Sequence, residues 1–230
     1  MNWEKAYKPS DILNQGFPCS DEESVDTLLK IINSRKLKGS CVEKIGKNIE
    51  TNKFCCVTDI PLKDLHIHSK YYGQVAIGFS SKEIHENFQP VIYVPIQRVS
   101  KKQVMPDESF QLMSDIEMHN SEGNYECSEF WTGILRDKIV NSGVVNEEDF
   151  GALFKDFVKF TAFSNISSET FYSEREWRHV GNYKFKADAL AAIIAPEKYL
   201  GKVKEYIYSH QDYKDNSEIS LLSWEFVQNC

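Results

Sequence analysis

The densest group of residues able to do chemistry is the charged run Glu174-Arg175-Glu176-Trp177-Arg178. Along an extended backbone, Glu174, Glu176 and Arg178 would share one face of the chain. Two carboxylates and a guanidinium are costly to bury unless they are paired, so we expect this face to line solvent or a polar cleft. The structural alternative is an edge strand with a solvated charged face, anchored in the core by Trp177.

A second candidate site follows the apolar run at residues 53–58. Thr58 and Asp59 stand where this predicted strand turns into a short helix that contains Pro61, and such a turn leaves free backbone N–H groups that suit a pyrophosphate. His68 and Tyr72 come soon afterwards and could contact the same ligand. The alternative is that Thr58 or Asp59 caps the helix and that His68 is a hydrogen-bonded structural residue.

The residues that commonly bind metals do not stand at metal-site spacing. His66 and His68 form an H-x-H pair, but no third and fourth ligand follows at the spacing of a zinc site. We therefore predict no metal site. The cysteines include no C-x-x-C pair, and we expect reduced thiols at all six: Cys19, Cys41, Cys55, Cys56, Cys127 and Cys230.

The elements that must position these residues follow from capping signals and hydrophobic periodicity. Ser20 and Glu23 form a capping box that predicts a helix over residues 20–34. The apolar spacing of residues 147–163 predicts a long helix. Further helices are expected at 81–87 and 196–209, and strands at 53–58, 74–79, 91–94, 189–195 and 219–224. Since the chain has no Gly-rich phosphate loop, this order favours a mixed α+β fold over a doubly wound parallel sheet.

Length and charge limit the classes of function. The chain has 230 residues, with 27 Lys and Arg against 34 Asp and Glu and a formal net charge of −7, so we expect a single domain over residues 1–230. An acidic chain does not offer the broad basic surface that nucleic acids or anionic lipids require. Since no run reaches the length of a membrane span and the first residues lack the apolar core of a signal peptide, we predict a cytoplasmic protein without membrane contact.

Several blocks together resemble the AbiGi-type abortive phage infection family in their order and spacing. The resemblance covers about residues 20–200, and its blocks are Phe54–Leu62, His68, Tyr72–Phe79, Pro90–Val94 and Phe171–Val180. Their layout is also similar to that of ADP-ribosyltransferase-like folds, in which a late Glu-x-Glu pair matches Glu174 and Glu176. This resemblance implies an α+β domain with ADP-ribosyltransferase-like mixed sheets and flanking helices. One departure is that Gly16-Phe17-Pro18-Cys19-Ser20 replaces the His-Phe-Thr-like strand near the amino terminus.

The activity that the resemblance implies is transfer of ADP-ribose from NAD to a macromolecule, a protein or a nucleic acid. Glu176 would stabilise an oxocarbenium-like transition state, and Glu174 would orient or deprotonate the acceptor. The expected NAD-binding residues are Thr58, Asp59, His68, Tyr72 and Arg178, of which Arg178 would neutralise the pyrophosphate and Tyr72 would stack on nicotinamide.

Two other functions remain open. The chain could be a catalytically silent antitoxin or sensor that binds a cognate toxin or a phage component, with the run at residues 174–178 serving as an ion-pair scaffold. Its acidic charge fits an antitoxin that covers a basic toxin surface. A third candidate is a nuclease in which Asp59, Glu174 and Glu176 hold a magnesium ion.

Overall fold

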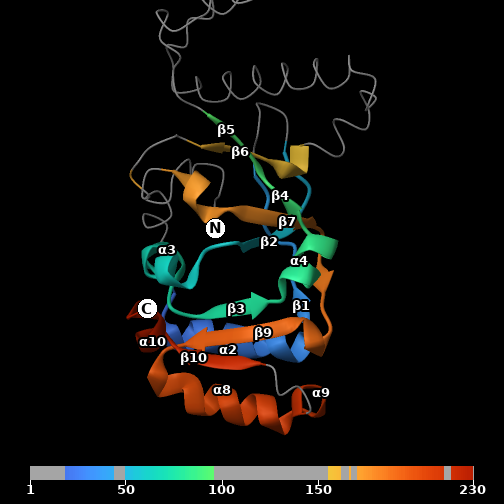
Figure 1. Cartoon of the computed structure of the whole chain (residues 1–230). Helices are drawn as coiled ribbons and strands as arrows, with labels where there is room; N and C mark the ends of the chain where they lie inside the picture. Colours follow the sequence, from blue (N-terminus) through green and yellow to red (C-terminus); the bar gives the residue numbers. More distant parts are fainter. Residues whose placement is uncertain are drawn as a thin grey trace, which may run out of the picture.

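The computed structural model describes residues 19–43, 50–95, 155–161, 166, 170–214 and 219–229. Over these residues the chain has a mixed α+β architecture with several small sheets (Figure 1). This confirms the predicted fold class, and the finer ADP-ribosyltransferase-like arrangement stays a prediction. No helix among the described residues is long and apolar enough to cross a membrane.

The first sheet forms around a largely buried central strand. β9 (Leu190–Ala195) pairs in parallel with β10 (Ser220–Ser223) and antiparallel with β3 (Ala76–Phe79). Apolar side chains point to both faces of β9, which explains its nearly continuous hydrophobic sequence. β3 and β10 are therefore the two edges of this sheet.

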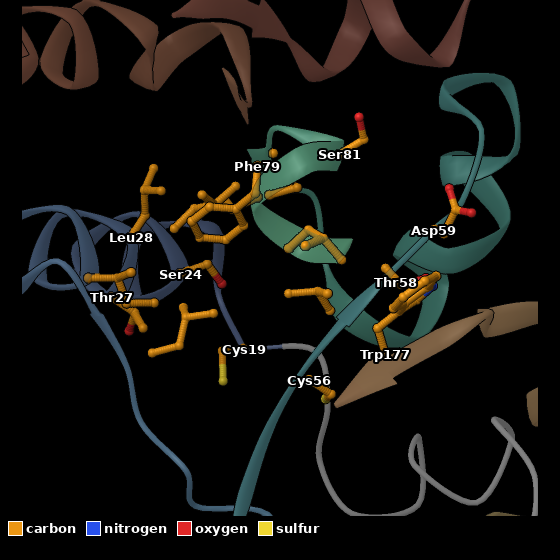
Figure 2. A pocket seen from close by; sticks show the side chains of 18 of the residues that line it. Cys19, Ser24, Thr27, Leu28, Cys56, Thr58, Asp59, Phe79, Ser81 and Trp177 are labelled. Carbon is orange, nitrogen blue, oxygen red and sulfur yellow. The ribbon is translucent and has the colours of Figure 1, made fainter. Parts of the chain in front are cut away.

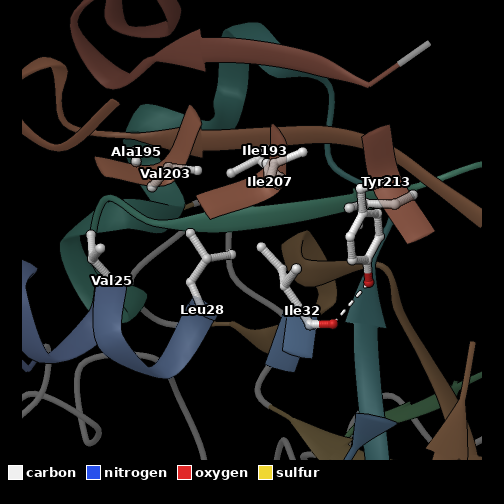
Figure 3. Close-up of a cluster of buried hydrophobic side chains, with 9 residues drawn as sticks. Val25, Leu28, Ile32, Ile193, Ala195, Val203, Ile207 and Tyr213 are labelled. Atoms are coloured by element: carbon white, nitrogen blue, oxygen red, sulfur yellow. Dashed lines mark hydrogen bonds between the residues drawn. The ribbon is translucent and has the colours of Figure 1, made fainter. Parts of the chain in front are cut away.

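Two helices cover one face of the first sheet. α2 (Asp21–Ser34) begins with the predicted capping box, and α8 (Glu197–Ser209) follows β9 directly. Figure 3 shows their apolar side chains meeting those of β9, and the Tyr213 hydroxyl donating a hydrogen bond of 2.8 Å to the carbonyl of Ile32. This core consists of Val25, Leu28, Ile32, Leu190, Ile193, Ala195, Val203, Ile207 and Tyr213. On the other face, Ile194 packs with α10 (Trp224–Gln228) and with Leu65 at the start of α3 (Leu65–Tyr72).

The second sheet carries the candidate site residues. β7 (Glu176–Val180) lies between β2 (Phe54–Thr58) and β4 (Gln89–Pro90), and both neighbours are antiparallel to it. Thr58 is opposite Glu176, and Cys56 is opposite Arg178. One face of this sheet joins a second apolar core that contains Cys55, Phe88, Tyr183, Phe185 and Ala189. The opposite face carries the charged side chains.

Shorter elements complete the described chain. α4 (Ser81–Asn87) connects β3 to β4, and β1 (Lys36–Leu37) pairs with β8 (Tyr183–Lys184). β5 (Ile92–Pro95) pairs in parallel with β6 (Val158–Thr161). Short 3-10 helices span Leu62–Asp64, Lys155–Phe157, Phe171–Glu174 and Ala187–Ala189, and the short helix α9 (Gln211–Lys214) follows α8.

Most predicted elements are confirmed within the described residues, and the predicted helix over residues 147–163 is wrong at its carboxyl end. Residues 155–157 form a 3-10 helix and residues 158–161 form β6. Val158, Lys159 and Thr161 are all buried, so the strand lacks the alternation that would have distinguished it from a helix face. The first part of the predicted helix, at 147–154, lies outside the described residues.

Candidate functional site

β7 places Glu176 and Arg178 on one face of the second sheet and Trp177 and His179 on the other. β7 is the central strand of its sheet, so the alternative of an edge strand with a solvated charged face is wrong. The charged face is buried, since Glu176 is 5% exposed and Arg178 is 0% exposed. Glu174 lies outside the strand, at the end of the 3-10 helix Phe171–Glu174.

Lys159 joins three carboxylates at the centre of the site. Its Nζ lies 2.6 Å from Oε2 of Glu176, 3.1 Å from Oε2 of Glu174 and 3.6 Å from Oε1 of Glu43. The same ammonium lies 4.2 Å from the centre of the Phe171 ring. β6 therefore supplies a cation, 8% exposed, to the acidic residues that the sequence had singled out.

Arg178 holds the other side of the same group. Its Nε lies 2.7 Å from Oε1 of Glu176, and its Nη2 lies 2.6 Å from Oε2 of Glu43. Its Nη1 donates a hydrogen bond of 3.0 Å to the backbone carbonyl of Asp156, and the guanidinium lies 4.1 Å from the centre of the Phe54 ring. We call the five residues Glu43, Lys159, Glu174, Glu176 and Arg178 the ionic cluster.

The protonation states of the ionic cluster follow from burial and pairing. Burial opposes ionisation of Glu176, but the charges of Arg178 and Lys159 outweigh it and lower the pKa of Glu176 to about 2. Burial raises the pKa of Glu174, and the nearby charge of Lys159 offsets only part of that rise. Burial opposes the charge of Lys159, but the three carboxylates still raise its pKa well above its ordinary value. Glu176 is therefore an ionised carboxylate with a cation on each oxygen.

This pairing predicts an acid-sensitive contribution to stability. Because the folded-state pKa of Glu176 lies below its ordinary value of 4.5, its contribution is present above about pH 4.5 and is lost as the pH falls towards about 2. We expect Glu176→Gln to unfold more easily at neutral pH, by a few kcal/mol, and to lose less stability than the wild type between pH 4.5 and 2.5.

Urea unfolding at a series of pH values, followed by circular dichroism, measures this difference. Glu205→Gln, an exposed change on α8, is the control and should follow the wild-type profile. If the free energy of unfolding depends on pH in the same way for the wild type and Glu176→Gln, the ion pairs of Glu176 contribute nothing to stability.

His68, Tyr72 and Glu174 meet at a pocket of about 290 Å³ beside α3. The Tyr72 hydroxyl donates a hydrogen bond to the Glu174 carboxylate, and the His68 and Tyr72 rings stack with their centres 4.1 Å apart. Burial, and then the charge of Lys159, lower the pKa of His68 to about 4, so its imidazole is neutral at pH 7. The volume lies at the lower end of the range for ligand pockets, so most of a dinucleotide would lie outside it.

Thr58 and Asp59 line a second, larger cavity of about 790 Å³, which we call the inter-sheet groove. Figure 2 shows its side chains converging from α2 on one side and from β2 and Trp177 on the other, with Phe79 and Ser81 between them. The sequence thus identified five cofactor-binding candidates that the structure separates. Thr58 and Asp59 line the groove, His68 and Tyr72 line the smaller pocket, and Arg178 is buried in the ionic cluster.

The strand end at Thr58 contacts the Glu174 segment directly. The Thr58 hydroxyl donates a hydrogen bond to the backbone carbonyl of Glu174, and the Asp59 N–H donates one of 3.2 Å to the carbonyl of Arg175. The Asp59 N–H is therefore already bonded and not free for an anion. The predicted helix cap at Thr58 or Asp59 is wrong, because the following 3-10 helix begins after Pro61 and has no side-chain cap.

Sequence reasoning missed Lys159 and Glu43. Lys159 stands between the apolar residues Val158 and Phe160, and a lysine at that place was the available signal for a buried ion pair. Glu43 lies between β1 and β2, and nothing in its local sequence distinguishes it. The predicted thiols are confirmed where the structure describes them, since Cys19, Cys41, Cys55 and Cys56 are free; Cys127 and Cys230 lie outside the described residues.

A comparison with known protein families finds a match over most of the chain. A family model described as "Putative abortive phage resistance protein AbiGi, antitoxin" matches residues 35–226. The matched range contains all five members of the ionic cluster and begins just after α2. No curated protein and no solved structure shows significant similarity to the chain.

Proposed function

This chain belongs to the AbiGi family of abortive phage resistance proteins, and on that premise we propose that it is an antitoxin that neutralises a cognate toxin by binding it. The family description supports a role in phage defence and a protein partner. The proposal therefore makes binding, and not turnover of a substrate, the activity of the chain.

The observation that carries this proposal is the internal pairing of Glu176. A catalytic carboxylate must reach its substrate, but Glu176 is 5% exposed and each of its oxygens already contacts a cation, Lys159 or Arg178. Buried charges are stable only when paired and hydrogen-bonded. This arrangement supports a scaffold in which the cluster joins β6, β7 and the segment before β2.

The charge of the chain also supports a protein partner. A net charge of −7 favours association with a basic surface, because complementary charges speed encounter and reject unsuitable partners. The same charge does not favour direct binding of nucleic acid. The net charge therefore fits an antitoxin that binds the basic surface of a toxin and does not itself bind nucleic acid.

Transfer of ADP-ribose from NAD stays a prediction, which the growth and labelling experiment below also tests. Glu174 lines the smaller pocket together with His68 and Tyr72. Of Glu174 and Glu176, it is therefore the carboxylate that a ligand could reach. The Tyr72 hydroxyl and the Lys159 ammonium both donate hydrogen bonds to the Glu174 carboxylate. Glu174 is therefore better placed to bind or orient a ligand than to transfer a proton.

Growth of cells that express the chain tests the proposal. We expect the chain alone to leave growth unchanged, the product of the adjacent gene alone to arrest it, and both together to restore it. Purified chain incubated with labelled NAD and cell extract should transfer no label. Arrest by the chain alone would contradict the antitoxin role, and relief of that arrest by Glu176→Gln, with the variant folded and expressed at the wild-type level, would favour the transferase.

A further inference from the structure

We propose that the inter-sheet groove is the surface that holds the toxin, and that it takes an extended segment of the toxin as an added strand on the free edge of β3. This inference rests on the proposed antitoxin function and makes it specific. It names a place on this chain and the chemistry of the partner segment that fits there.

The lining of the groove shows that β3 faces it with its edge. Side chains of successive strand residues point to opposite faces, so a strand that presents a face contributes every second residue. Here five consecutive residues, 75–79, line the groove, and they include Gly78, which has no side chain. Backbone groups of β3 therefore border the cavity.

The pairing of the sheets leaves that edge open. Among the described residues β3 pairs only with β9, through its other edge. On the opposite wall, residues 56–59, the end of β2 and the residue after it, also line the groove consecutively. β2 pairs with β7 on one side, and within the described ranges its other side has only the single bridge between Phe54 and Cys41. Exposed strand edges carry unpaired N–H and C=O groups that can accept another strand.

Apolar side chains around these edges would anchor the bound segment. Leu28 from α2, Phe79 from β3 and Trp177 from β7 all line the groove and lie around its interior in Figure 2. The His85 ring stacks on Trp177, with ring centres 5.2 Å apart. Aromatic and aliphatic pockets of this kind supply most of the affinity at protein interfaces. A volume of about 790 Å³ is enough for several side chains of a peptide.

The charged residues that line the groove indicate which charge the toxin segment carries. Its described lining includes two acidic residues, Glu23 and Asp59, and no lysine or arginine. Both acidic residues are exposed; one oxygen of Glu23 accepts hydrogen bonds from Ser20 in the capping box, so Asp59 is the carboxylate better placed to meet a partner. The toxin segment that fits is therefore an extended stretch of apolar residues that also carries lysine or arginine.

Hydrogen–deuterium exchange of the intact chain, alone and with the purified product of the adjacent gene, tests the strand addition. We expect some amides within residues 75–79 to exchange readily in the free chain and to become protected by at least about tenfold in the complex. Amides already protected in the free chain would show that this edge is covered, and amides that stay unprotected in a formed complex would show that no strand is added there. Either result overturns the inference.

Matched substitutions on α2 test the groove by affinity. Thr27 is exposed and lines the groove, whereas Asn33 is exposed on the same helix and does not line it. Thr27→Arg places bulk and positive charge in the site, so we expect it to weaken toxin binding by about tenfold or more, and Asn33→Arg to change it by less than about twofold. Circular dichroism should show that both variants fold.

The outcomes separate this inference from the proposed function. If the wild type and Thr27→Arg bind the toxin equally well, the groove is not the docking site, but the antitoxin role stands. If the folded wild type binds no toxin, both proposals fail. Protection of residues 75–79 by NAD alone would overturn the inference and favour a nucleotide site between the two sheets.

Discussion

Replacement of Lys159 by methionine is expected to lower the free energy of unfolding by about 3–5 kcal/mol, the usual cost of removing one partner from a buried ion pair. Its ammonium is the cation that Glu174 and Glu176 share, and it also faces Glu43. Methionine has a similar length, so the change removes charge while keeping much of the side-chain volume. Three carboxylates would then share the single charge of Arg178 within the described cluster.

Urea unfolding followed by tryptophan fluorescence measures this change. Lys184→Met, an exposed lysine of β8, is the control and should change stability by less than about 0.5 kcal/mol. Combining Lys159→Met with Glu174→Gln should cost less than the sum of the two single changes, because the second removes a charge that the first leaves unpaired. A loss below about 1 kcal/mol for Lys159→Met would contradict the role of the cluster as a scaffold.

Arg178→Lys is expected to destabilise the fold by about 2–4 kcal/mol although it keeps the positive charge. The guanidinium reaches Glu176, Glu43 and the backbone carbonyl of Asp156 at the same time, and it lies over the Phe54 ring. A lysine ammonium at one point cannot reproduce that planar set of contacts. At least one buried carboxylate or carbonyl oxygen would lose its donor.

Arg175→Lys is the matched control for this change. Arg175 lies three residues earlier in the same segment and is exposed, so the same substitution there should change stability by less than about 0.5 kcal/mol. Thermal unfolding of the two variants gives a direct comparison. Equal melting temperatures would show that the geometry of the Arg178 contacts contributes nothing beyond charge.

The sequence predicted local structure well where capping and periodicity agree. Ser20 and Glu23 form the expected capping box at the start of α2, and the apolar run predicted as a strand at residues 189–195 contains the central strand β9. Both signals depend on residues close together in the chain. Lys159 misled the prediction because a strand buried on both faces shows no alternation, and a lysine within it looks like the polar side of a helix.

The candidate site depended on long-range pairing that the sequence only partly revealed. The charged run correctly predicted that Glu176 and Arg178 share a face, because alternation along a strand is local. That this face is buried depends on Lys159, from β6, and on Glu43, from the segment before β2. Which elements pack against a strand is decided by the whole fold, so an exposed cleft and a buried cluster looked alike in the sequence.

Isothermal titration calorimetry of the purified chain with the purified product of the adjacent gene tests the central claim most directly. The comparison uses the wild type and Glu176→Gln, at a temperature at which circular dichroism shows both to be folded, without NAD. The account predicts stoichiometric binding with dissociation constants that agree within about threefold, because Glu176 supports the fold and does not react. No binding by the folded wild type, or binding that requires NAD, would contradict it.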